Sequence, residues 1–400
     1  MSRMVSFEPG APMEEGGIPL CVPEIRGKEW EYIKHCLDTN FVSSVGPFVD
    51  RFERDTANYV GTKFGVATST GTAALHIALL VAGVQPDQEV LVSTLTFIAP
   101  VNAIRYAGAM PVFIDAEPAY WQMDPQKMRD FVEKGCSWKN GELHNRHTHR
   151  RVRAIMPVHI LGHPVDMDPI LVIARKYNLV VIEDATESLG ANYKGTMTGH
   201  IGDIACFSFN GNKIITTGGG GMIVTDNESW ARKAKYLTTQ AKDDPFEFEH
   251  DEIGYNYRLT NLQAALGCAQ LEQLDDYIAA KRRIAGVYTD AFKNMTGLNP
   301  MQEADFAFSI HWLYTILVDP ARFGMDSRAL MNRLLLRNIQ ARPLWQPAHL
   351  SKAHRGAYAT DCSVAERLNR EAVSLPCSVG LSTTEQGRVI NCIVENGKSV

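Results

Sequence analysis

Short apolar runs alternate with amphipathic segments between about residues 64 and 240. The runs rich in β-branched residues predict strands, and in chain order they are FGVAT, EVLVS, MPVFID, VRAIMPV, LVVIED, IACFSF and GMIVT. Segments between them, such as GTAALHIALLVAGV and MDPILVIARKYN, have the length and spacing of helices. This alternation predicts a large α/β domain with a mostly parallel seven-stranded sheet, a class that binds ligands at the carboxyl ends of its strands.

The pattern changes after about residue 245. Residues 260–292 form one amphipathic pattern without a strand, which predicts a single long helix. The segments beyond it, including WLYTILVD and LLLRNIQARPL, predict a smaller α+β domain. We therefore expect a large domain with an N-terminal arm over residues 1–255. The linking helix and the small domain are expected over 256–400.

Composition narrows the classes of partner. The chain is 45% hydrophobic and 21% charged, as in ordinary globular proteins, and its formal net charge of -5 argues against a nucleic-acid partner. No apolar run approaches the length of a membrane span, and the first 20 residues lack the apolar stretch of a signal peptide. We therefore expect no membrane association.

The eight cysteines are scattered, and none forms a CxxC pair. This spacing is typical of reduced thiols in a cytoplasmic protein rather than of a disulfide framework or a zinc site. The basic stretch HNRHTHRRVR at residues 144–153 is interpreted as a solvated loop before a strand.

One predicted strand ends in two carboxylates. In LVVIEDATESLGA, Glu183 and Asp184 follow four apolar residues. Carboxylates at a strand end bind metals, act as bases or hold a cationic nitrogen of a cofactor, and Asp184 alone is also a plausible helix N-cap. A metal is disfavoured because no DxD or HExxH pattern accompanies them.

The segment STGTAAL, residues 69–75, joins a strand to a helix through small residues. Free N–H groups at the start of a helix, together with its dipole, favour an anion beside Gly71 and Thr72. Many such turns bind nothing. The chain contains no GxxxxGK[ST] and no GxGxxG after the first strand, which disfavours ATP and NAD.

A third candidate is Lys213, which lies in FSFNGNKIITTGGGGM. A lysine in a Gly/Asn turn is usually a surface charge. Here Ser208 and Asn210 lie beside it, and an anion cradle and Asp184 precede it in the chain. An amine for the aldehyde, a carboxylate for the ring nitrogen and donors for the phosphate are the three anchors that pyridoxal phosphate requires. The glycines precede a strand, so we interpret them as backbone clearance rather than a dinucleotide loop.

These motifs resemble the DegT/DnrJ/EryC1/StrS aminotransferases, which are fold-type I pyridoxal-phosphate enzymes acting on keto-sugar nucleotides. The resemblance covers nearly the whole chain. It rests on GTAAL, TFIAPVNAI, PVHILGHPVDMDPI, VIEDATESLGA, FSFNGNKIITTGGGGM and GYNYRLTNLQAALG. The residues within these motifs are most similar to those of a branch acting on 4-keto-6-deoxy sugars, often labelled LegC-like.

The resemblance implies a role for each cofactor-site residue. Lys213 would be the Schiff-base lysine and general acid/base of an enzyme alternating between pyridoxal 5'-phosphate and pyridoxamine phosphate, and Asp184 would pair with the ring nitrogen. The phosphate would be held by Gly71, Thr72 and Ser208, with Asn210 beside them. Phe97 would stack on the ring, unless it is simply packed in the core.

Two further positions follow from the same resemblance. Many relatives carry Gln or His where this chain has Glu187, which would lie near the 3'-oxygen of the cofactor. Asn256 would reach the phosphate of the neighbouring subunit's cofactor, which implies a homodimer with shared active sites; otherwise it is an Asn in a turn.

Substrate contacts are less constrained by the motifs. Ser44 and Gly46 would line the entry for the sugar or phosphate, and His159, Arg342 and His349 would reach the diphosphate or the hexose. For each of these residues, a helix cap or a satisfied core histidine is an equally good interpretation.

The expected reaction moves an amino group from L-glutamate to C4 of a nucleotide-linked 4-keto-6-deoxyhexose destined for surface glycans such as lipopolysaccharide O-antigen. A UDP-linked 2-acetamido sugar is the first expectation. A GDP- or dTDP-linked sugar, with amination at C4 as in perosamine synthesis or at C3, is the alternative. A binding protein that keeps the fold without catalysis is disfavoured because Lys213 and Asp184 are both present. A dehydrating sister group carries histidine at the lysine position.

Overall fold

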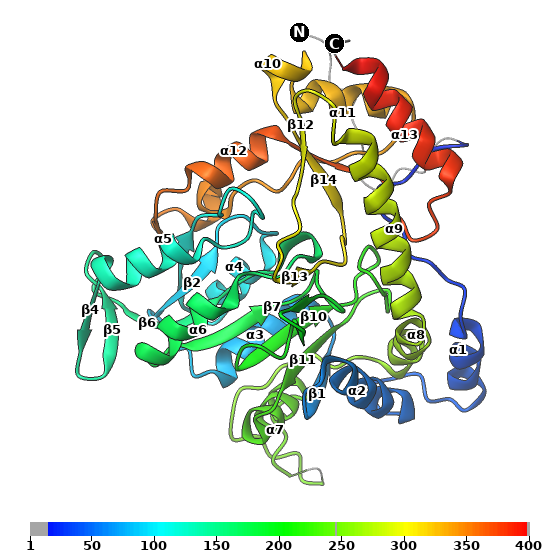
Figure 1. Ribbon diagram of the computed structural model, residues 1–400. Helices are drawn as coiled ribbons and strands as arrows, with labels where there is room; N and C mark the ends of the chain where they lie inside the picture. The colour runs from blue at the N-terminus through cyan, green and yellow to red at the C-terminus, as the bar shows by residue number, and fades with distance from the viewer. Residues whose placement is uncertain (1–14, 245, 398–400) are drawn as a thin grey trace.

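The computed structural model describes residues 15–244 and 246–397, so the first part of the expected N-terminal arm lies outside the described residues. All seven predicted strands form and lie together in one large sheet (Figure 1). In spatial order they are β1 (Phe64–Thr68), β11 (Gly221–Thr225), β10 (Ile204–Ser208), β7 (Val180–Asp184), β6 (Arg151–Met156), β2 (Glu89–Ser93) and β3 (Met110–Ile114). Within this series only β11 runs antiparallel to its neighbours, so the sheet is mostly parallel, as expected.

The sheet has ten strands rather than the predicted seven. β15 (Tyr358–Ala359), from the C-terminal region, pairs with β3. A hairpin of β4 (Cys136–Lys139) and β5 (Glu142–Asn145) pairs with β6. Part of the predicted basic loop is therefore strand. Its polar residues gave no strand signal because an edge hairpin can be solvated on one face.

Both faces of the sheet are covered by apolar side chains. Val90 and Val92 of β2 belong to one buried cluster and Leu91 belongs to another, since successive side chains of a strand point to opposite faces. Helix α3 (Gly71–Val81) contributes to the first cluster and α6 (Met167–Lys176) to the second. The remaining helices of this region are α1 (Glu29–Asp38), α2 (Pro47–Val60), α4 (Ala99–Tyr106), α5 (Pro125–Asp130) and α7 (Glu228–Thr238).

The long helix predicted over residues 260–292 is two helices. α8 (Asn261–Leu271) ends before Glu272, and α9 (Leu274–Phe292) begins in a new direction (Figure 1). Glu272 is held at the break by Tyr32 and Arg51. The apolar pattern continues through the break because α8 packs on α1 and α2, whereas α9 packs on the C-terminal elements.

The C-terminal region contains a three-stranded antiparallel sheet of β12 (Leu298–Pro300), β14 (Tyr314–Val318) and β16 (Ala372–Leu375). Its helices are α10 (Pro320–Phe323), α11 (Ser327–Leu336), α12 (Ser363–Glu371) and α13 (Thr383–Asn396). A second small sheet joins β13 (Ala307–Phe308) to β8 (Asn192–Tyr193) and β9 (Thr196–Met197), so it connects the two regions.

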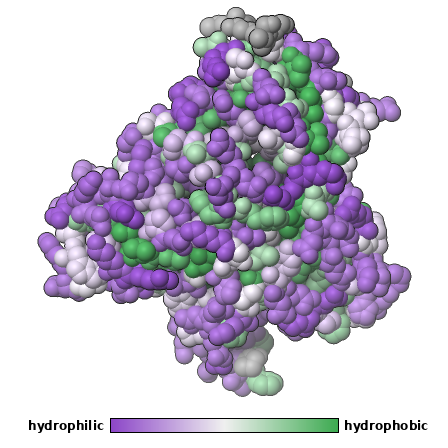
Figure 2. All heavy atoms as spheres, viewed as in Figure 1, coloured by the Kyte–Doolittle hydropathy of each residue, from purple (hydrophilic) through white to green (hydrophobic). Residues whose placement is uncertain are grey.

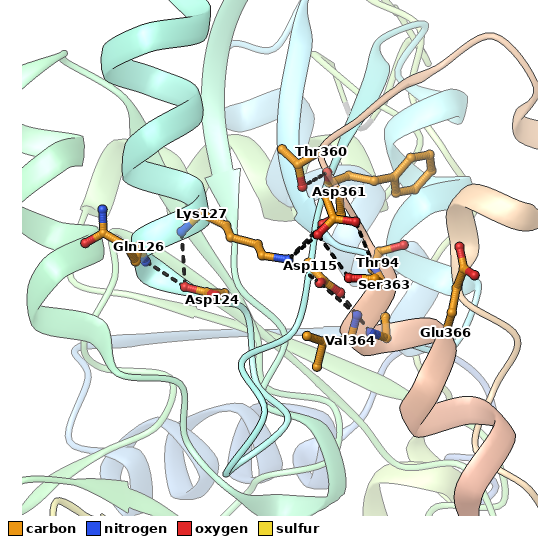
Figure 3. A network of polar contacts seen from close by, with 12 residues as sticks. Thr94, Asp115, Asp124, Gln126, Lys127, Thr360, Asp361, Ser363, Val364 and Glu366 are labelled. Atoms are coloured by element: carbon orange, nitrogen blue, oxygen red, sulfur yellow. Dashed lines mark hydrogen bonds and ion pairs between the residues drawn. The ribbon is translucent and has the colours of Figure 1, made fainter.

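An ion-pair network fixes the C-terminal region against the large sheet (Figure 3). Asp115, buried just after β3, accepts hydrogen bonds from the backbone N–H groups of Val364 and Ala365 at the start of α12. The Lys127 Nζ lies 2.6 Å from Asp115 and 3.0 Å from Asp361. The buried carboxylate is thus both hydrogen-bonded and paired, which is what makes its burial tolerable.

Hydrophilic residues cover most of the face shown in Figure 2, with smaller hydrophobic areas among them. Within the described ranges, no helix combines the length and apolar character needed to cross a membrane.

Candidate active site

A cavity of about 320 Å³ lies where β7 and β10 end and α3 begins. Eight of the residues predicted from the sequence line it together: Gly71, Thr72, Phe97, Asp184, Glu187, Ser208, Asn210 and Lys213. They come from segments up to 142 residues apart, from Gly71 to Lys213. The carboxyl edge of the sheet brings them together because the parallel strands all end there.

The two carboxylates at the end of β7 have different surroundings. Glu183 is completely buried and accepts hydrogen bonds from His159 Nε2 and from the backbone N–H groups of Gly199, Ile201 and Gly202. Burial alone would raise the pKa of Glu183, but these donors outweigh it and hold the pKa below its ordinary value. Glu183 is therefore a structural anion that orders the loop over residues 199–202.

Asp184 faces the cavity instead. Its Oδ1 accepts a hydrogen bond from Thr186 N at 3.1 Å, and burial raises its pKa against the opposing effects of Thr186 and Lys213. A cation placed beside this carboxylate would therefore relieve an unfavourable buried charge.

Lys213 is positioned by a turn in which its N–H donates to the Asn210 carbonyl oxygen at 3.0 Å. Its Nζ lies 3.6 Å from Glu187 Oε1 and 4.0 Å from the centroid of the Trp312 ring, with 12% of the side chain exposed. Glu187 Oε2 accepts from Leu161 N at 2.9 Å. Burial raises the pKa of Glu187 to about 7, although the Lys213 charge opposes the rise. A lysine amine and a carboxyl with a pKa near neutrality thus share the cavity.

The first turn of α3 forms the expected anion cradle. Thr70 caps the helix by accepting a hydrogen bond from Ala73 N, and the early N–H groups of a helix have no acceptor within it. A Cβ on Gly71 would lie 2.7 Å from the Ser208 Cβ, so only glycine lets the helix start approach the end of β10. Gly221 likewise lets β11 approach the Thr70 carbonyl oxygen of the same chain.

The comparisons with known proteins agree with this geometry. A profile of the DegT/DnrJ/EryC1/StrS aminotransferase family matches residues 23–394. The chain belongs to this family. It is 37% identical to GDP-perosamine synthase of Caulobacter vibrioides over 93% of this chain and 96% of the relative. It is 38% identical to GDP-perosamine synthase of Escherichia coli O157:H7 over 92% of this chain and 95% of that one.

A solved structure shares the architecture. The DegT DnrJ EryC1 StrS aminotransferase from Brucella abortus superposes with a TM-score of 0.85 at 25% identity, covering 93% of this chain and 96% of that chain. The fold-type I architecture is thereby confirmed. The protein is a pyridoxal-phosphate-dependent aminotransferase.

The cavity of this aminotransferase fits that cofactor. It offers an amine in Lys213, a buried carboxylate in Asp184, and a helix start at Gly71 and Thr72 that only a glycine permits. The Phe97 ring, 55% exposed, lies at the cavity rather than in the core. These groups match the aldehyde, the ring nitrogen, the phosphate and the ring face in turn.

Several predicted residues lie elsewhere. Ser44 and Gly46 lie in the loop before α2, where Gly46 packs on Asn261, and neither lines the cavity. Asn256 is exposed, and its backbone pairs with Thr239. Its position at the surface leaves the expected role toward a second subunit as a prediction.

The expectation that His159 contacts substrate is wrong. Its ring is fully buried, Nδ1 accepts from Val165 N, and Nε2 donates to Glu183. The histidine instead completes the structural anion site. His349 is also engaged: Nδ1 lies 2.8 Å from Thr94 Oγ1 and Nε2 lies 3.2 Å from Glu366, so it helps to fix the C-terminal region near the end of β2.

A second cavity of about 320 Å³ adjoins the first, with which it shares Asn212, Trp312 and Trp345. Arg342 lines this second cavity, and its expected contact with substrate stays a prediction. Neither Trp312 nor Trp345 is among the site residues expected from the sequence, although Trp345 lies only three residues after Arg342. No local pattern marks these tryptophans, because the C-terminal region brings them to a site built by the residues of the large sheet.

Proposed function

We propose that this aminotransferase moves an amino group from L-glutamate to C4 of a nucleotide-linked 4-keto-6-deoxyhexose, giving a 4-amino-4,6-dideoxy sugar nucleotide for surface glycans. The observation that carries the proposal is the pair of adjoining cavities. One contains Lys213, Glu187 and Asp184, and the other contains Arg342, whose positive charge suits a diphosphate. The relatives named as GDP-perosamine synthases support the sugar substrate.

Asp184, Lys213 and Glu187 have separate roles in the proposed reaction. Pyridoxal phosphate, when bound, supplies the aldehyde that carries the amino group and a ring that stabilises negative charge on the reacting carbon. Asp184 holds a proton on the ring nitrogen. Lys213 Nζ takes the proton from the donor carbon and returns it to the sugar carbon. Glu187, 3.6 Å from Nζ, holds or accepts the proton that Lys213 does not carry.

The nucleotide is proposed to be GDP. Perosamine is a 4-amino-4,6-dideoxy sugar, and two relatives that match over more than nine-tenths of this chain are named as synthases of its GDP-linked form. The UDP-linked 2-acetamido sugar, which the resemblance of the motifs led us to expect, stays a competing prediction.

The test offers purified enzyme L-glutamate with GDP-, UDP- and dTDP-linked 4-keto-6-deoxy sugars and their 3-keto isomers, and detects the amino product by mass. We expect the GDP-linked 4-keto sugar to give the highest kcat/KM. Preference for the UDP-linked sugar would restore the first expectation. Loss of all amination by cofactor-loaded enzyme would contradict the substrate class.

The homodimer with shared sites is also a proposal, and it rests on the exposed Asn256. Asn256→Ala and Lys213→Ala should each be inactive alone. If each site combines Lys213 of one chain with Asn256 of the other, mixed dimers of the two variants contain one intact site and regain activity. If subunit exchange is demonstrated and activity still does not recover, Asn256 acts within its own chain.

A further inference from the structure

Lys281 of α9 is the only buried lysine among the described residues, with a relative exposure of 2%. It lies beside the active site. Its Nζ donates to the Trp312 carbonyl oxygen at 2.9 Å, to Cys21 Sγ at 3.3 Å and to Cys377 Sγ at 3.6 Å. These three acceptors use all three N–H groups of an ammonium ion. Two sulfurs, rather than a carboxylate, therefore face a buried positive charge.

The backbone holds the two cysteines side by side. Cys377 N donates to the Leu20 carbonyl oxygen at 2.8 Å, and Val22 N donates to Ser378 Oγ at 3.0 Å. The Cys377 thiol donates to the Trp312 carbonyl oxygen at 3.5 Å, so both sulfurs lie around the same carbonyl and ammonium groups. The side-chain interaction with Cys377 is the largest cause that lowers the pKa of Cys21 to about 6; burial opposes it and Lys281 reinforces it. Ionisation of Cys21 is therefore favoured relative to an ordinary thiol, and a second sulfur contacts the same ammonium group.

Cys21 differs from the other cysteines. The pKa of each of the other seven is raised: by burial for Cys36, Cys136, Cys206, Cys268, Cys362 and Cys392, and mainly by the hydrogen bond to Cys21 for Cys377. Those seven are buried, whereas Cys21 is partly exposed and lines the second cavity. A small oxidant entering this cavity meets a nucleophilic sulfur.

The cluster also contacts the active site. Cys21 Sγ lies 3.4 Å from the Asn212 carbonyl oxygen, which accepts the Trp312 indole N–H at 2.7 Å. The Trp312 ring lies against Lys213, and Lys281 holds the Trp312 carbonyl. A change of charge or bonding at Cys21 therefore acts on two residues that line the cofactor cavity.

We propose that Cys21 and Cys377 form a reversible redox pair that senses peroxide and regulates the active site through Asn212 and Trp312. The Cys21 thiolate attacks one oxygen of hydrogen peroxide, giving a sulfenic acid and a hydroxide that is protonated to water. The Cys377 sulfur then attacks the Cys21 sulfur, a disulfide forms, and the hydroxyl group leaves with the Cys377 proton as a second water. A dithiol reductant restores both thiols by exchange, as expected of a transient disulfide in a reducing compartment.

The test uses the full-length reduced protein, exposed to hydrogen peroxide and then alkylated and mapped by peptide mass. We expect a Cys21–Cys377 disulfide that dithiothreitol removes. In Cys377→Ser, the Cys21 sulfenic acid should accumulate and be trapped by dimedone. Cys36→Ser serves as the matched control and should leave the disulfide unchanged.

Activity supplies a separate readout, taken as the ratio of oxidised to reduced enzyme within each variant. The ratio should fall about fivefold in the wild type, the effect of disturbing one hydrogen bond, and recover with reductant. Oxidation of buried cysteines before Cys21, or a Cys21 bond to Lys281 instead of Cys377, would overturn the proposed pair. A disulfide that forms without any change in activity would overturn its coupling to the active site.

Discussion

Two lysines contact Trp312, one at its ring and one at its carbonyl oxygen, and their surroundings give them opposite roles. Lys281 Nζ donates to one carbonyl and two sulfurs and is enclosed by protein. Lys213 Nζ has the Trp312 ring at 4.0 Å and one carboxylate at 3.6 Å, and it lines a cavity. An amine reacts when its hydrogen-bonding capacity is not used up by the fold and when space for a reactant lies beside it. Lys213 meets both conditions and Lys281 meets neither.

The largest expected difference between the two lysines is chemical. Borohydride reduction of the enzyme loaded with pyridoxal phosphate should label Lys213 and leave Lys281 unlabelled. Lys213→Ala should lose the label and lower amino transfer by at least about 10³-fold, because both the anchoring amine and the proton carrier are removed. Lys194→Ala, at an exposed lysine paired with Asp168, is the control and should keep both. Labelling of Lys281 in the folded enzyme would refute the comparison.

Substitutions of the two carboxylates at the end of β7 should have opposite effects, since Asp184 is expected to affect activity and Glu183 to affect stability. Asp184→Asn should lower kcat by about 10²-fold or more, because an amide cannot hold the proton of the ring nitrogen. It should not destabilise the apoprotein, because burial already disfavours the charge of Asp184. A fall in kcat below tenfold would argue against its pairing with the ring.

Glu183→Gln is the opposite case. The change removes a charge that His159 and three N–H groups stabilise, so it should cost about 3 kcal/mol of unfolding free energy at pH 7. Since the folded-state pKa of Glu183 is lowered, the wild-type advantage exists above its ordinary pKa of 4.5 and disappears as pH falls through the folded value. Denaturant unfolding of both proteins at pH 7 and below pH 4 measures this.

Glu187→Gln should reveal the proton shared with Lys213. The pKa of Glu187 is raised from 4.5 to about 7, so its stabilising effect is complete below pH 4.5 and is lost as pH rises through 7. Glutamine does not titrate. The variant should therefore gain up to about 3 kcal/mol relative to wild-type apoprotein between pH 5 and pH 8. A difference that is constant across this range would show that Glu187 is ionised throughout.

The smallest expected effect concerns Trp312, which contacts both lysines. Trp312→Phe keeps an aromatic face for Lys213 but loses the hydrogen bond to the Asn212 carbonyl. Loss of one such bond, about 1 kcal/mol, should lower kcat roughly fivefold. Trp30→Phe, at a side chain that is 81% exposed, should leave kcat unchanged. Equal effects of the two changes would remove Trp312 from the site.

The sequence by itself determined the seven central strands and the cavity residues from Gly71 to Lys213. Strand periodicity, the small residues of the turn before α3 and the turn chemistry around Lys213 are local signals. A parallel sheet then places the ends of its strands at one edge, so these residues meet without further information.

Only the tertiary structure decided which side chains from distant parts of the sequence line the site and which are buried away from it. It enclosed His159 behind Glu183, divided the predicted long helix at Glu272, and brought Trp312 and Trp345 to the cavity. It also brought Cys21 and Cys377, 356 residues apart in the chain, into contact with the same buried ammonium group. Such contacts depend on how α9 and the C-terminal region pack against the large sheet. An apolar pattern indicates that a residue is buried but not which residues it packs against.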